Sequence, residues 1–466
     1  MNRRTFLSLA LAASARGQAV APPNILFIMA DDLGYGDLGC FGQKHIKTPH
    51  IDKLAAAGMR FTEAYAGCTV CAPSRSVLMT GKHTGHTSVR SNTGGVPLLP
   101  EDITIAEVLR TVGYKSGCFG KWGLGDVGTA GVPTKQGFDA FYGYLHQVHA
   151  HFQYPGYLID DEELQPAPGG AGAQYANDAI AGLANGFIRQ YARKKTPFFC
   201  YVPFTLPHLE LLVPGDSMVP YDGKIPEGEP FVDAQRHYAN QAKPRTAYAG
   251  MVSRLDGYVG QLMATLESEK QMENTIVFFC SDNGSATALW NDGGFFNSTG
   301  GLRGHKQNFY EGGIRTPMIV RWPGKVKAGV VSAQPWMFQD VLPTLAELAG
   351  AKAPADIDGV SVVPTLLGKG KQVQPEYLYW ELPKFSAMKG DPLEEVPMQA
   401  VRMGKWKAVR PQANGTLELY DLSKDPLEKT NVAAQNPAVM TKIEGICKTA
   451  RVVPRRQLQP DNWQWH

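Results

Sequence analysis

A cysteine and an arginine lie close together near residue 71, in a pattern that could support catalysis on an anion. The motif and the residues that end it are Cys71-Ala72-Pro73-Ser74-Arg75 and Thr80-Gly81. Pro73 suits the first turn of a helix and Gly81 suits its end, which places Cys71 at a helix N-terminus. Unpaired N–H groups and the helix dipole favour an anion there, and Arg75 follows one turn later. The spacing therefore predicts a site for a negatively charged substrate.

The same residues allow other interpretations, which the sequence leaves open. Cys68 and Cys71 have the CxxC spacing of a redox pair, and a thiol in this setting can also be a buried structural group. A cysteine phosphatase also needs a Cys and an Arg at a helix start, although its loop separates them by more than the three residues found here. The seven cysteines are an odd number in a long chain, so a disulfide scaffold is excluded.

Acidic and amide side chains follow two apolar runs that have the character of strands. Asp31 and Asp32 come directly after residues 24–30, and Asp282 and Asn283 come directly after residues 275–281. Because parallel strands deliver the residues at their carboxyl ends to one edge of a sheet, these side chains should converge. A site with only oxygen ligands favours Ca²⁺ or Mg²⁺ over Zn²⁺. Helix caps or turn formers are the alternative interpretation of either cluster taken alone.

The elements that would position these residues alternate between strands and helices. The runs at 24–30 and 275–281 are rich in β-branched and aromatic residues without polar alternation, as expected for strands buried on both faces. Further strands are predicted at residues 114–119 and 197–202. Helices are predicted at residues 49–57, 103–112, 245–266 and 338–348. The pattern indicates an α/β fold with a large, doubly wound domain and a mixed, mainly parallel sheet.

The chain divides into four predicted parts, of which the first is a short N-terminal segment, residues 1–19. The catalytic α/β domain covers residues 22–350, and a crossing segment rich in proline, glycine and lysine covers residues 351–374. Residues 375–466 are expected to form a small C-terminal α+β domain with an antiparallel sheet and a helix. Two stretches inside the large domain, residues 156–185 and 212–241, are expected to be rich in loops.

The first nineteen residues have the features of an export signal. Arg3 and Arg4 precede Phe6 and a short apolar run that ends in small residues, a pattern that resembles a twin-arginine signal. This run is too short to span a bilayer comfortably, and no later segment is long and apolar enough. We therefore expect an exported protein, periplasmic or extracellular, without a stable membrane span. Without the signal, 43 basic residues balance 43 acidic ones, so no nucleic-acid partner is indicated.

The motif at residues 71–75 resembles that of the type I sulfatases, the formylglycine-dependent, arylsulfatase-like members of the alkaline phosphatase superfamily. Their signature is Cys-x-Pro-Ser-Arg followed by Thr-Gly, and this sequence matches it completely, with similarity over nearly the whole chain. The resemblance implies that a maturation enzyme oxidises Cys71 to formylglycine, whose hydrated aldehyde is the nucleophile. It also implies one Ca²⁺, with Mg²⁺ as the alternative, held by the modified Cys71 and by Asp31, Asp32, Asp282 and Asn283.

Two lysines and a histidine also match the family pattern. Lys121, in Gly-Lys-Trp-Gly-Leu-Gly, and Lys306, ahead of Tyr-Glu-Gly-Gly, correspond to lysines that hold the sulfate, and His208 corresponds to a histidine near the ester oxygen. An isolated lysine in a loop is usually only solvated, so the surrounding motifs support these assignments. Arg75 and the two lysines, together with a divalent ion, outweigh the three carboxylates of the metal site by about two formal charges, which suits an anionic ester.

One position departs from the commonest family pattern. Gly123 stands where many relatives have a histidine that contacts the hydrated aldehyde. A different group must then deprotonate this hydrate to release sulfate. His149 is the first candidate and His151 the second, because both fall where relatives place another sulfate-contacting side chain and an imidazole is suited to neutral pH. A pair of surface histidines is the alternative interpretation.

The leading functional prediction is hydrolysis of a sulfate ester, with a sulfated aryl compound or a sulfated glycan as the substrate. The alternative is a phosphonate monoester or phosphodiester hydrolase of the same superfamily, because such relatives can share the nucleophile. A non-catalytic glycan-binding protein with this fold would be expected to lack the site residues, and nearly all of them are present.

Overall fold

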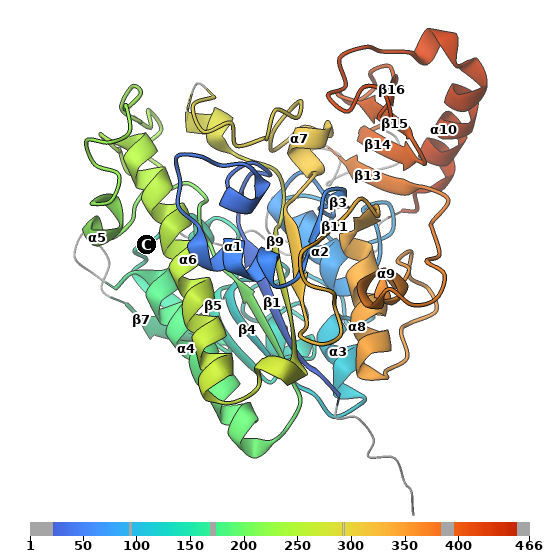
Figure 1. Cartoon of the computed structure of the whole chain (residues 1–466). Helices are drawn as coiled ribbons and strands as arrows, with labels where there is room; N and C mark the ends of the chain where they lie inside the picture. The colour runs from blue at the N-terminus through green and yellow to red at the C-terminus, as the bar shows by residue number, and fades with distance from the viewer. Residues whose placement is uncertain are drawn as a thin grey trace, which may run out of the picture.

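A mixed sheet of ten strands lies at the centre of the larger part of the molecule (Figure 1). The computed structural model describes residues 22–92, 96–167, 174–290, 292, 294–383 and 396–453, so the predicted signal at residues 1–19 lies outside the described residues. The strands of the large sheet are β1 (Asn24–Ala30), β2 (Met59–Phe61), β4 (Lys115–Lys121), β5 (Ala140–Tyr144), β6 (Tyr157–Asp160), β7 (Glu163–Pro166), β8 (Phe198–Pro203), β9 (Thr275–Ser281), β10 (Met318–Arg321) and β11 (Val330–Ser332).

The strand order is β11-β2-β10-β9-β1-β8-β4-β5-β6-β7, with a parallel centre. Neighbouring strands from β9 to β5 all pair in parallel, whereas β10, β6 and β7 pair antiparallel to their neighbours. A separate two-stranded pair joins β3 (Ala64–Tyr65) to β12 (Trp336–Met337). Every residue of β1 and of β9 is buried, as their uninterrupted apolar sequences predict. The predicted doubly wound, mainly parallel α/β fold is confirmed.

Helices cover both faces of this sheet (Figure 1). Side chains of β1 point alternately to the two sides, so that Leu26 and Ile28 enter one core and Ile25 and Phe27 enter the other. The first core is covered by α1 (Pro49–Ala56), α4 (Ala176–Lys194), α5 (Gly215–Met218) and α6 (Pro244–Ser268). The second core is covered by α2 (Cys71–Thr80), α3 (Ile105–Arg110), α8 (Val341–Ala349) and α9 (Val363–Leu367).

The C-terminal part is a four-stranded antiparallel sheet with one helix. Its elements are β13 (Leu378–Leu382), β14 (Met398–Met403), β15 (Trp406–Arg410), β16 (Glu418–Asp421) and α10 (Pro437–Thr449). Trp380 and Val409 pack into the core of the large part, whereas Val401 and Leu419 pack against Ile443 of α10. The small sheet is therefore buried on both faces, and the predicted antiparallel sheet plus helix is confirmed.

A buried ion network joins the small sheet to α7 (Glu311–Ile314) of the large part. Lys407 Nζ lies 2.9 Å from a carboxylate oxygen of Glu311 and 3.3 Å from one of Glu428. All three side chains have an exposed fraction of 0%. Burial alone would raise the pKa of Glu311, but the ammonium group of Lys407 and the guanidinium group of Arg315 lower it well below its usual range.

The prediction that residues 156–185 are rich in loops is wrong. This stretch contains β6, β7 and the first half of α4, a helix of 19 residues. Gly182 and Gly186 disfavour a helix in isolation, but added Cβ atoms there would meet nothing within 4 Å, because both glycines face outward. Ile180 and Phe187 on the opposite side are buried, so tertiary packing outweighs the low helix propensity of glycine.

Residues 351–374 also contain more structure than expected, because α9 packs against α8. The stretch from residue 212 to 241 is mostly irregular, as predicted, and also contains the short helix α5. Among the described residues, no helix combines the length and the apolar character needed to cross a bilayer.

Candidate active site

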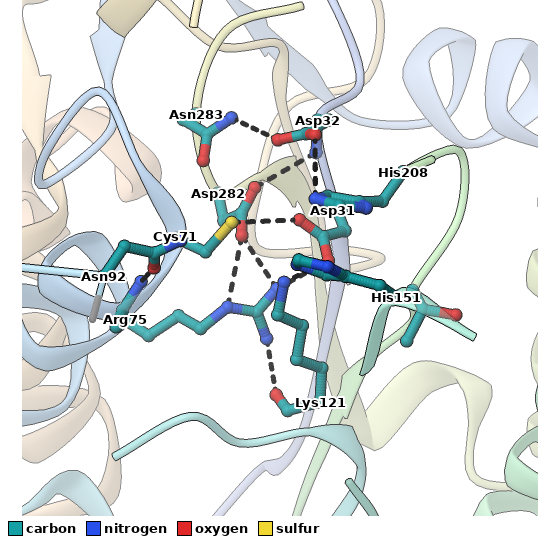
Figure 2. A network of polar contacts seen from close by, with 12 residues as sticks. Asp31, Asp32, Cys71, Arg75, Asn92, Lys121, His151, His208, Asp282 and Asn283 are labelled. Atoms are coloured by element: carbon teal, nitrogen blue, oxygen red, sulfur yellow. Dashed lines mark hydrogen bonds and ion pairs between the residues drawn. The ribbon is translucent and has the colours of Figure 1, made fainter. Parts of the chain in front are cut away.

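Two adjacent parallel strands bring the predicted acidic residues together. Ala30 and Ser281 are partners at the carboxyl ends of β1 and β9, and the N–H of Asp282 donates to the carbonyl of Ala30 over 3.1 Å. Asp31 and Asp32 therefore lie beside Asp282, as Figure 2 shows. The backbone N–H of Asp32 donates to Asp282 Oδ1 over 3.2 Å. All three carboxylates are almost fully buried.

Cys71 is the first residue of α2, as the position of Pro73 predicts. Val70 caps the helix in an extended conformation, and Gly81 ends it with a φ of 69°. The Cys71 side chain has an exposed fraction of 0%, and its Sγ lies 3.3 Å from Asp31 Oδ1. Burial and the charge of Asp31 raise the pKa of the Cys71 thiol well above its usual value. The unmodified thiol is therefore neutral and a poor nucleophile.

The other residues of the motif fix the start of α2 against the sheet. The N–H of Gly67 donates to Ser74 Oγ over 3.0 Å, and Ser74 Oγ donates to the carbonyl of Asp282 over 2.5 Å. A Cβ at Gly67 would lie 2.5 Å from Val77 Cβ, so the loop before the helix packs closely on the helix itself. Ser74 thus connects the start of α2 to the end of β9.

Arg75 connects both strand ends to the end of β4. Its Nη2 lies 2.7 Å from Asp282 Oδ2, its Nε lies 3.1 Å from the same oxygen, and its Nη1 donates to the carbonyl of Lys121. Nη2 is also 3.8 Å from Asp31 Oδ2. Burial alone would lower the pKa of Arg75, but the charge of Asp282 outweighs it and raises this pKa.

Both predicted lysines lie in the same cluster. Lys121 Nζ is 2.7 Å from Asp31 Oδ2, and Lys306 Nζ is 2.8 Å from Asp32 Oδ2. Burial alone would lower the pKa of each lysine, but Asp31 raises that of Lys121 and Asp32 raises that of Lys306. Both ammonium groups therefore stay charged, and each is placed to exchange a carboxylate for an anionic ligand.

His208 completes this side of the cluster. Its Nε2 lies 3.1 Å from Lys306 Nζ and 3.3 Å from Asp32 Oδ2, while its Nδ1 hydrogen-bonds the carbonyl of Leu209. Burial and the positive charge of Lys306 lower the pKa of His208 to about 4. Since Nδ1 must carry the hydrogen that is donated to the carbonyl, Nε2 is the nitrogen that can exchange a proton.

The residues at the strand ends fit a hard divalent cation. Ligand atoms of Asp31, Asp32, Cys71 and His208 all lie within 4.8 Å of one another. Asn283 Nδ2 donates to Asp32 Oδ1 over 2.7 Å, while the buried Asn283 Oδ1 has no hydrogen-bond partner among the described residues. Burial and the like charge of Asp31 raise the pKa of Asp282 to about 6. Carboxylates that repel one another beside a free carbonyl oxygen match the oxygen ligands that Ca²⁺ and Mg²⁺ prefer.

Another group with metal-binding side chains lies at the opposite end of α2. His86 Nδ1 is 2.8 Å from Asp358 Oδ1, and His83 Nε2 is 3.6 Å from the same oxygen. The two imidazole rings are stacked with centroids 4.2 Å apart and planes 26° apart. Nearly parallel rings do not direct their in-plane lone pairs at a common ion. This network therefore joins α2 to the segment after α8 rather than forming a metal centre.

The two histidine candidates near residue 150 lie in different surroundings, although both belong to the 3-10 helix η3 (His149–His151). His149 packs edge-on against Tyr144, with centroids 4.9 Å apart, and over Tyr157 at 4.3 Å. His151 instead stacks on His208 with centroids 4.6 Å apart, and its Nδ1 lies 3.0 Å from His237 Nε2. The structure thus brings the second candidate, His151, to the cluster, whereas the defined contacts of His149 are with tyrosines.

Two further features of the site were missed in the sequence. Asn92 Oδ1 accepts the N–H of Ala72 over 2.8 Å, so it satisfies a free donor at the start of α2 (Figure 2). Tyr238, in the irregular stretch after α5, places its hydroxyl 3.3 Å from His151 Nδ1. Neither residue belongs to a recognisable motif, and only the folded chain brings them to the site.

Known proteins are similar in sequence to this chain over most of its length. The sulfatase family profile matches residues 23–351, and a second profile, described as N-sulphoglucosamine sulphohydrolase, C-terminal, matches residues 304–448. The chain is 34% identical to arylsulfatase A of Homo sapiens, over 93% of this chain and 89% of that protein. It is 29% identical to N-acetylgalactosamine-6-O-sulfatase of Bacteroides thetaiotaomicron, over 93% of this chain and 94% of that protein.

Solved structures agree with these matches. The structure of Ps i-CgsB in complex with k-i-k-neocarrahexaose is similar with a TM-score of 0.78 and 29% identity, over 94% of this chain and 95% of that chain. The phosphonate monoester hydrolase of Agrobacterium radiobacter shares the fold with a TM-score of 0.66 at 22% identity, over 94% of this chain and 97% of that chain. The range matched by the family profile, residues 23–351, covers most of the chain and includes the Cys71 motif and its partners. This chain therefore belongs to the sulfatase family of sulfuric ester hydrolases.

Proposed function

We propose that this protein removes sulfate from a sulfated glycan, and accepts aryl sulfates, through a formylglycine made from Cys71 and one bound Ca²⁺ or Mg²⁺. The observation that supports this most directly is the position of Cys71. It lies buried at the start of a helix, 3.3 Å from Asp31, in a cluster with two lysines and an arginine. An unmodified thiol of raised pKa has no evident use there, whereas a hydrated aldehyde would place its oxygens among these charges.

The modified residue and the cation supply the chemistry that unmodified side chains lack. The hydrated aldehyde offers one oxygen to attack sulfur and a second hydroxyl whose deprotonation expels sulfate, while the cation polarises oxygens beside it. The side chains of this protein hold the ester in place. Lys121 and Lys306 are within 2.8 Å of Asp31 and Asp32, which would also hold the cation, and both ammonium groups would then be available to bind the sulfuryl oxygens.

His208 is placed to protonate the leaving alcohol. Its Nε2 faces Lys306 and Asp32, and its Nδ1 is held by the carbonyl of Leu209. The pKa of about 4 keeps the imidazole neutral in the free protein, and an anionic ester between Lys306 and His208 would raise it. A proton on Nε2 can then be transferred to the ester oxygen as the bond to sulfur breaks.

A glycan substrate is supported by two relatives. Ps i-CgsB was solved in complex with k-i-k-neocarrahexaose, and the Bacteroides relative is named as an N-acetylgalactosamine-6-O-sulfatase. A cavity of about 490 Å³ in this protein is lined by residues of the irregular stretch after α5: Val232, Asp233, Ala234, Arg236, Tyr238 and Asn240. Because Tyr238 also contacts His151, this cavity adjoins the catalytic cluster and has room for the sugar that carries the sulfate.

Export and maturation belong to the same proposal. The signal-like residues 1–19 would direct the protein to the periplasm or the extracellular space, where sulfated polysaccharides are found. A maturation enzyme must oxidise Cys71 before the site closes, since the folded chain leaves this side chain an exposed fraction of 0%.

Sulfate esters are expected to be far better substrates than phosphodiesters. For the purified protein, kcat/KM for nitrophenyl sulfate should exceed that for bis(nitrophenyl) phosphate by at least about tenfold, or roughly 1.4 kcal/mol of transition-state stabilisation. Parallel assays on defined sulfated oligosaccharides, with released sulfate as the readout, would identify the sugar and the sulfate position. A preference for the phosphodiester would instead support the phosphonate and phosphodiester hydrolases that share the fold.

The geometry favours His151 over His149 as the base that replaces the histidine missing at Gly123. His151→Ala should slow sulfate release by roughly 100-fold or more. Stopped-flow assays of an activated aryl sulfate should then show a burst of released phenol followed by slow turnover. His149→Ala is the matched control, since that ring packs on Tyr144 and Tyr157, and it should lower the melting temperature without a burst. Unchanged steady-state rates for both variants would assign the role to water or to a metal-bound hydroxide.

A further inference from the structure

Gln147 is buried in a way that stable proteins normally avoid. Its side chain has an exposed fraction of 2%, and neither Oε1 nor Nε2 has a hydrogen-bond partner among the described residues. A primary amide offers two donors and one acceptor, and a buried polar group without partners costs free energy. Such a group in a native protein calls for an explanation, and a bound ligand that supplies the missing partners is one.

The neighbouring glutamine shows how such an amide is usually satisfied. Gln153 is also fully buried, but its Nε2 donates to the carbonyl of His208 over 3.2 Å. Its Oε1 accepts from Asn177 over 3.0 Å and from the Thr205 hydroxyl over 3.0 Å. The same segment thus holds one amide whose nitrogen and oxygen are both hydrogen-bonded and one without a partner among the described residues.

Gln147 occupies the space that the side chain of residue 123 would fill. A Cβ at Gly123 would lie 2.1 Å from Gln147 Nε2 and 2.8 Å from its Cδ, and Gly123 has a φ of 76°. The N–H of Gly123 donates to the carbonyl of Leu145 over 2.9 Å, which holds the two segments together. The amide of Gln147 can therefore lie here only because residue 123 is glycine and has no side chain.

Both segments lie at the edge of the sheet that carries the charged cluster. Gly123 follows Lys121 by two residues at the carboxyl end of β4, and Gln147 lies just beyond the carboxyl end of β5. Lys121 Nζ contacts Asp31, and His151, four residues after Gln147, stacks on His208. Ligands of open α/β sheets bind at this edge, beyond the carboxyl ends of parallel strands.

We propose that Gln147 is a substrate-contacting residue that hydrogen-bonds oxygens of the reacting group, and that Gly123 and Gln147 act as a pair. This inference rests on the proposed sulfatase mechanism. The amide N–H groups can donate to a sulfuryl oxygen, and the amide oxygen can accept from a hydroxyl of the hydrated residue 71. A neutral amide cannot take up a proton near pH 7, so Gln147 binds and orients while an imidazole serves as the base.

The test replaces the amide without emptying its space. Gln147→Met keeps the length of the side chain and removes its hydrogen bonds, and we expect kcat/KM for nitrophenyl sulfate to fall about 10- to 100-fold, as for a lost hydrogen bond to a charged group. Gly123→Ala should displace the amide and lower kcat/KM as well. The double variant Gly123→Ala/Gln147→Met should be little worse than either single variant, because both changes remove the same contact.

Binding of inorganic sulfate to each variant, measured by calorimetry, locates the contact independently of turnover. Weaker sulfate binding by Gln147→Met assigns the amide to the sulfuryl oxygens, and unchanged binding with a lowered kcat assigns it to the hydroxyls of residue 71. Gln339→Met is the control, since Gln339 is equally buried and its Nε2 hydrogen-bonds the carbonyl of Asp358 away from the cluster. It should alter the melting temperature only.

Two results are decisive against the inference. If Gln147→Met is folded and keeps both its sulfate affinity and its kcat/KM, the pair has no role in binding. If the unchanged protein hydrolyses no sulfate ester, the proposed function fails, and the calorimetric comparison still decides whether Gln147 binds the anion.

Discussion

Replacing Cys71 by alanine is expected to abolish sulfate ester hydrolysis, with a loss of at least about 10⁴-fold in kcat, and to leave the fold intact. The loss follows because no other nucleophile lies among the carboxylates, lysines and arginine of the described cluster. The fold should survive because the contact of the thiol with Asp31 is a single hydrogen bond of 3.3 Å. Circular dichroism and thermal melting would establish folding, and nitrophenyl sulfate assays would establish the loss.

Cys68→Ala is the matched control for this variant. Cys68 is equally buried three residues earlier, but its Sγ lies 3.8 Å from the carbonyl of Glu381 and outside the charged cluster. This variant should keep most of its activity. Peptide mass spectrometry of the active, unchanged protein should show residue 71 about 18 Da lighter than cysteine, as expected for an aldehyde in place of the thiol. Full activity with an intact thiol at residue 71 would overturn the proposed nucleophile.

Removing the bound cation is expected to stop turnover and to lower the melting temperature together. An ion bound only by the folded state stabilises it by about 2.7 kcal/mol when its free concentration is 100 times Kd. Lys121 and Lys306 lie 2.7 and 2.8 Å from Asp31 and Asp32, so a cation that binds these carboxylates would compete with both ammonium groups, and its removal should leave them paired with the carboxylates instead of sulfate. Thermal melting and assays with and without a chelator would measure both effects.

The variant Asp31→Asn distinguishes the effect of losing the bound ion from other effects of the chelator. This variant keeps the size of the side chain and removes one ligand charge, so its melting temperature should respond little to added Ca²⁺. Asp256→Asn is a suitable control, because that buried carboxylate accepts backbone N–H groups of His50 and Ile51 outside the site. Stoichiometric zinc in active enzyme, without calcium or magnesium, would contradict the assignment of a hard cation.

The parts of the site that are set by strand ends could be predicted from the sequence. The apolar runs before Asp31 and before Asp282 identify strands buried on both faces, and adjacent parallel strands bring their carboxyl ends together without any further information. The position of Cys71 at the start of α2 follows from Pro73 and Gly81 in the same way, because both residues act on the local backbone.

The parts that depend on packing between distant segments could not be predicted. His149 and His151 are two residues apart in a 3-10 helix, so their rings point in different directions. The ring of His149 packs against tyrosines, and the ring of His151 stacks on His208. The long helix α4 was missed because Gly182 and Gly186 have low helix propensity, and packing of the buried face with Ile180 and Phe187 compensates for it. No sequence pattern pointed to Gln147 as a site residue, because the position of its amide depends on the absence of a side chain at Gly123.

The buried network of Lys407, Glu311 and Glu428 sets an order of events during synthesis. Ribosomes add about 5 to 20 residues per second, so roughly half a minute passes between the appearance of residue 71 and that of residue 407. Glu311 is added before residue 407, and until Lys407 appears it lacks the ammonium group that compensates the burial of its carboxylate. The buried contact between α7 and the C-terminal sheet can therefore form only after residue 407 has been added, late in synthesis.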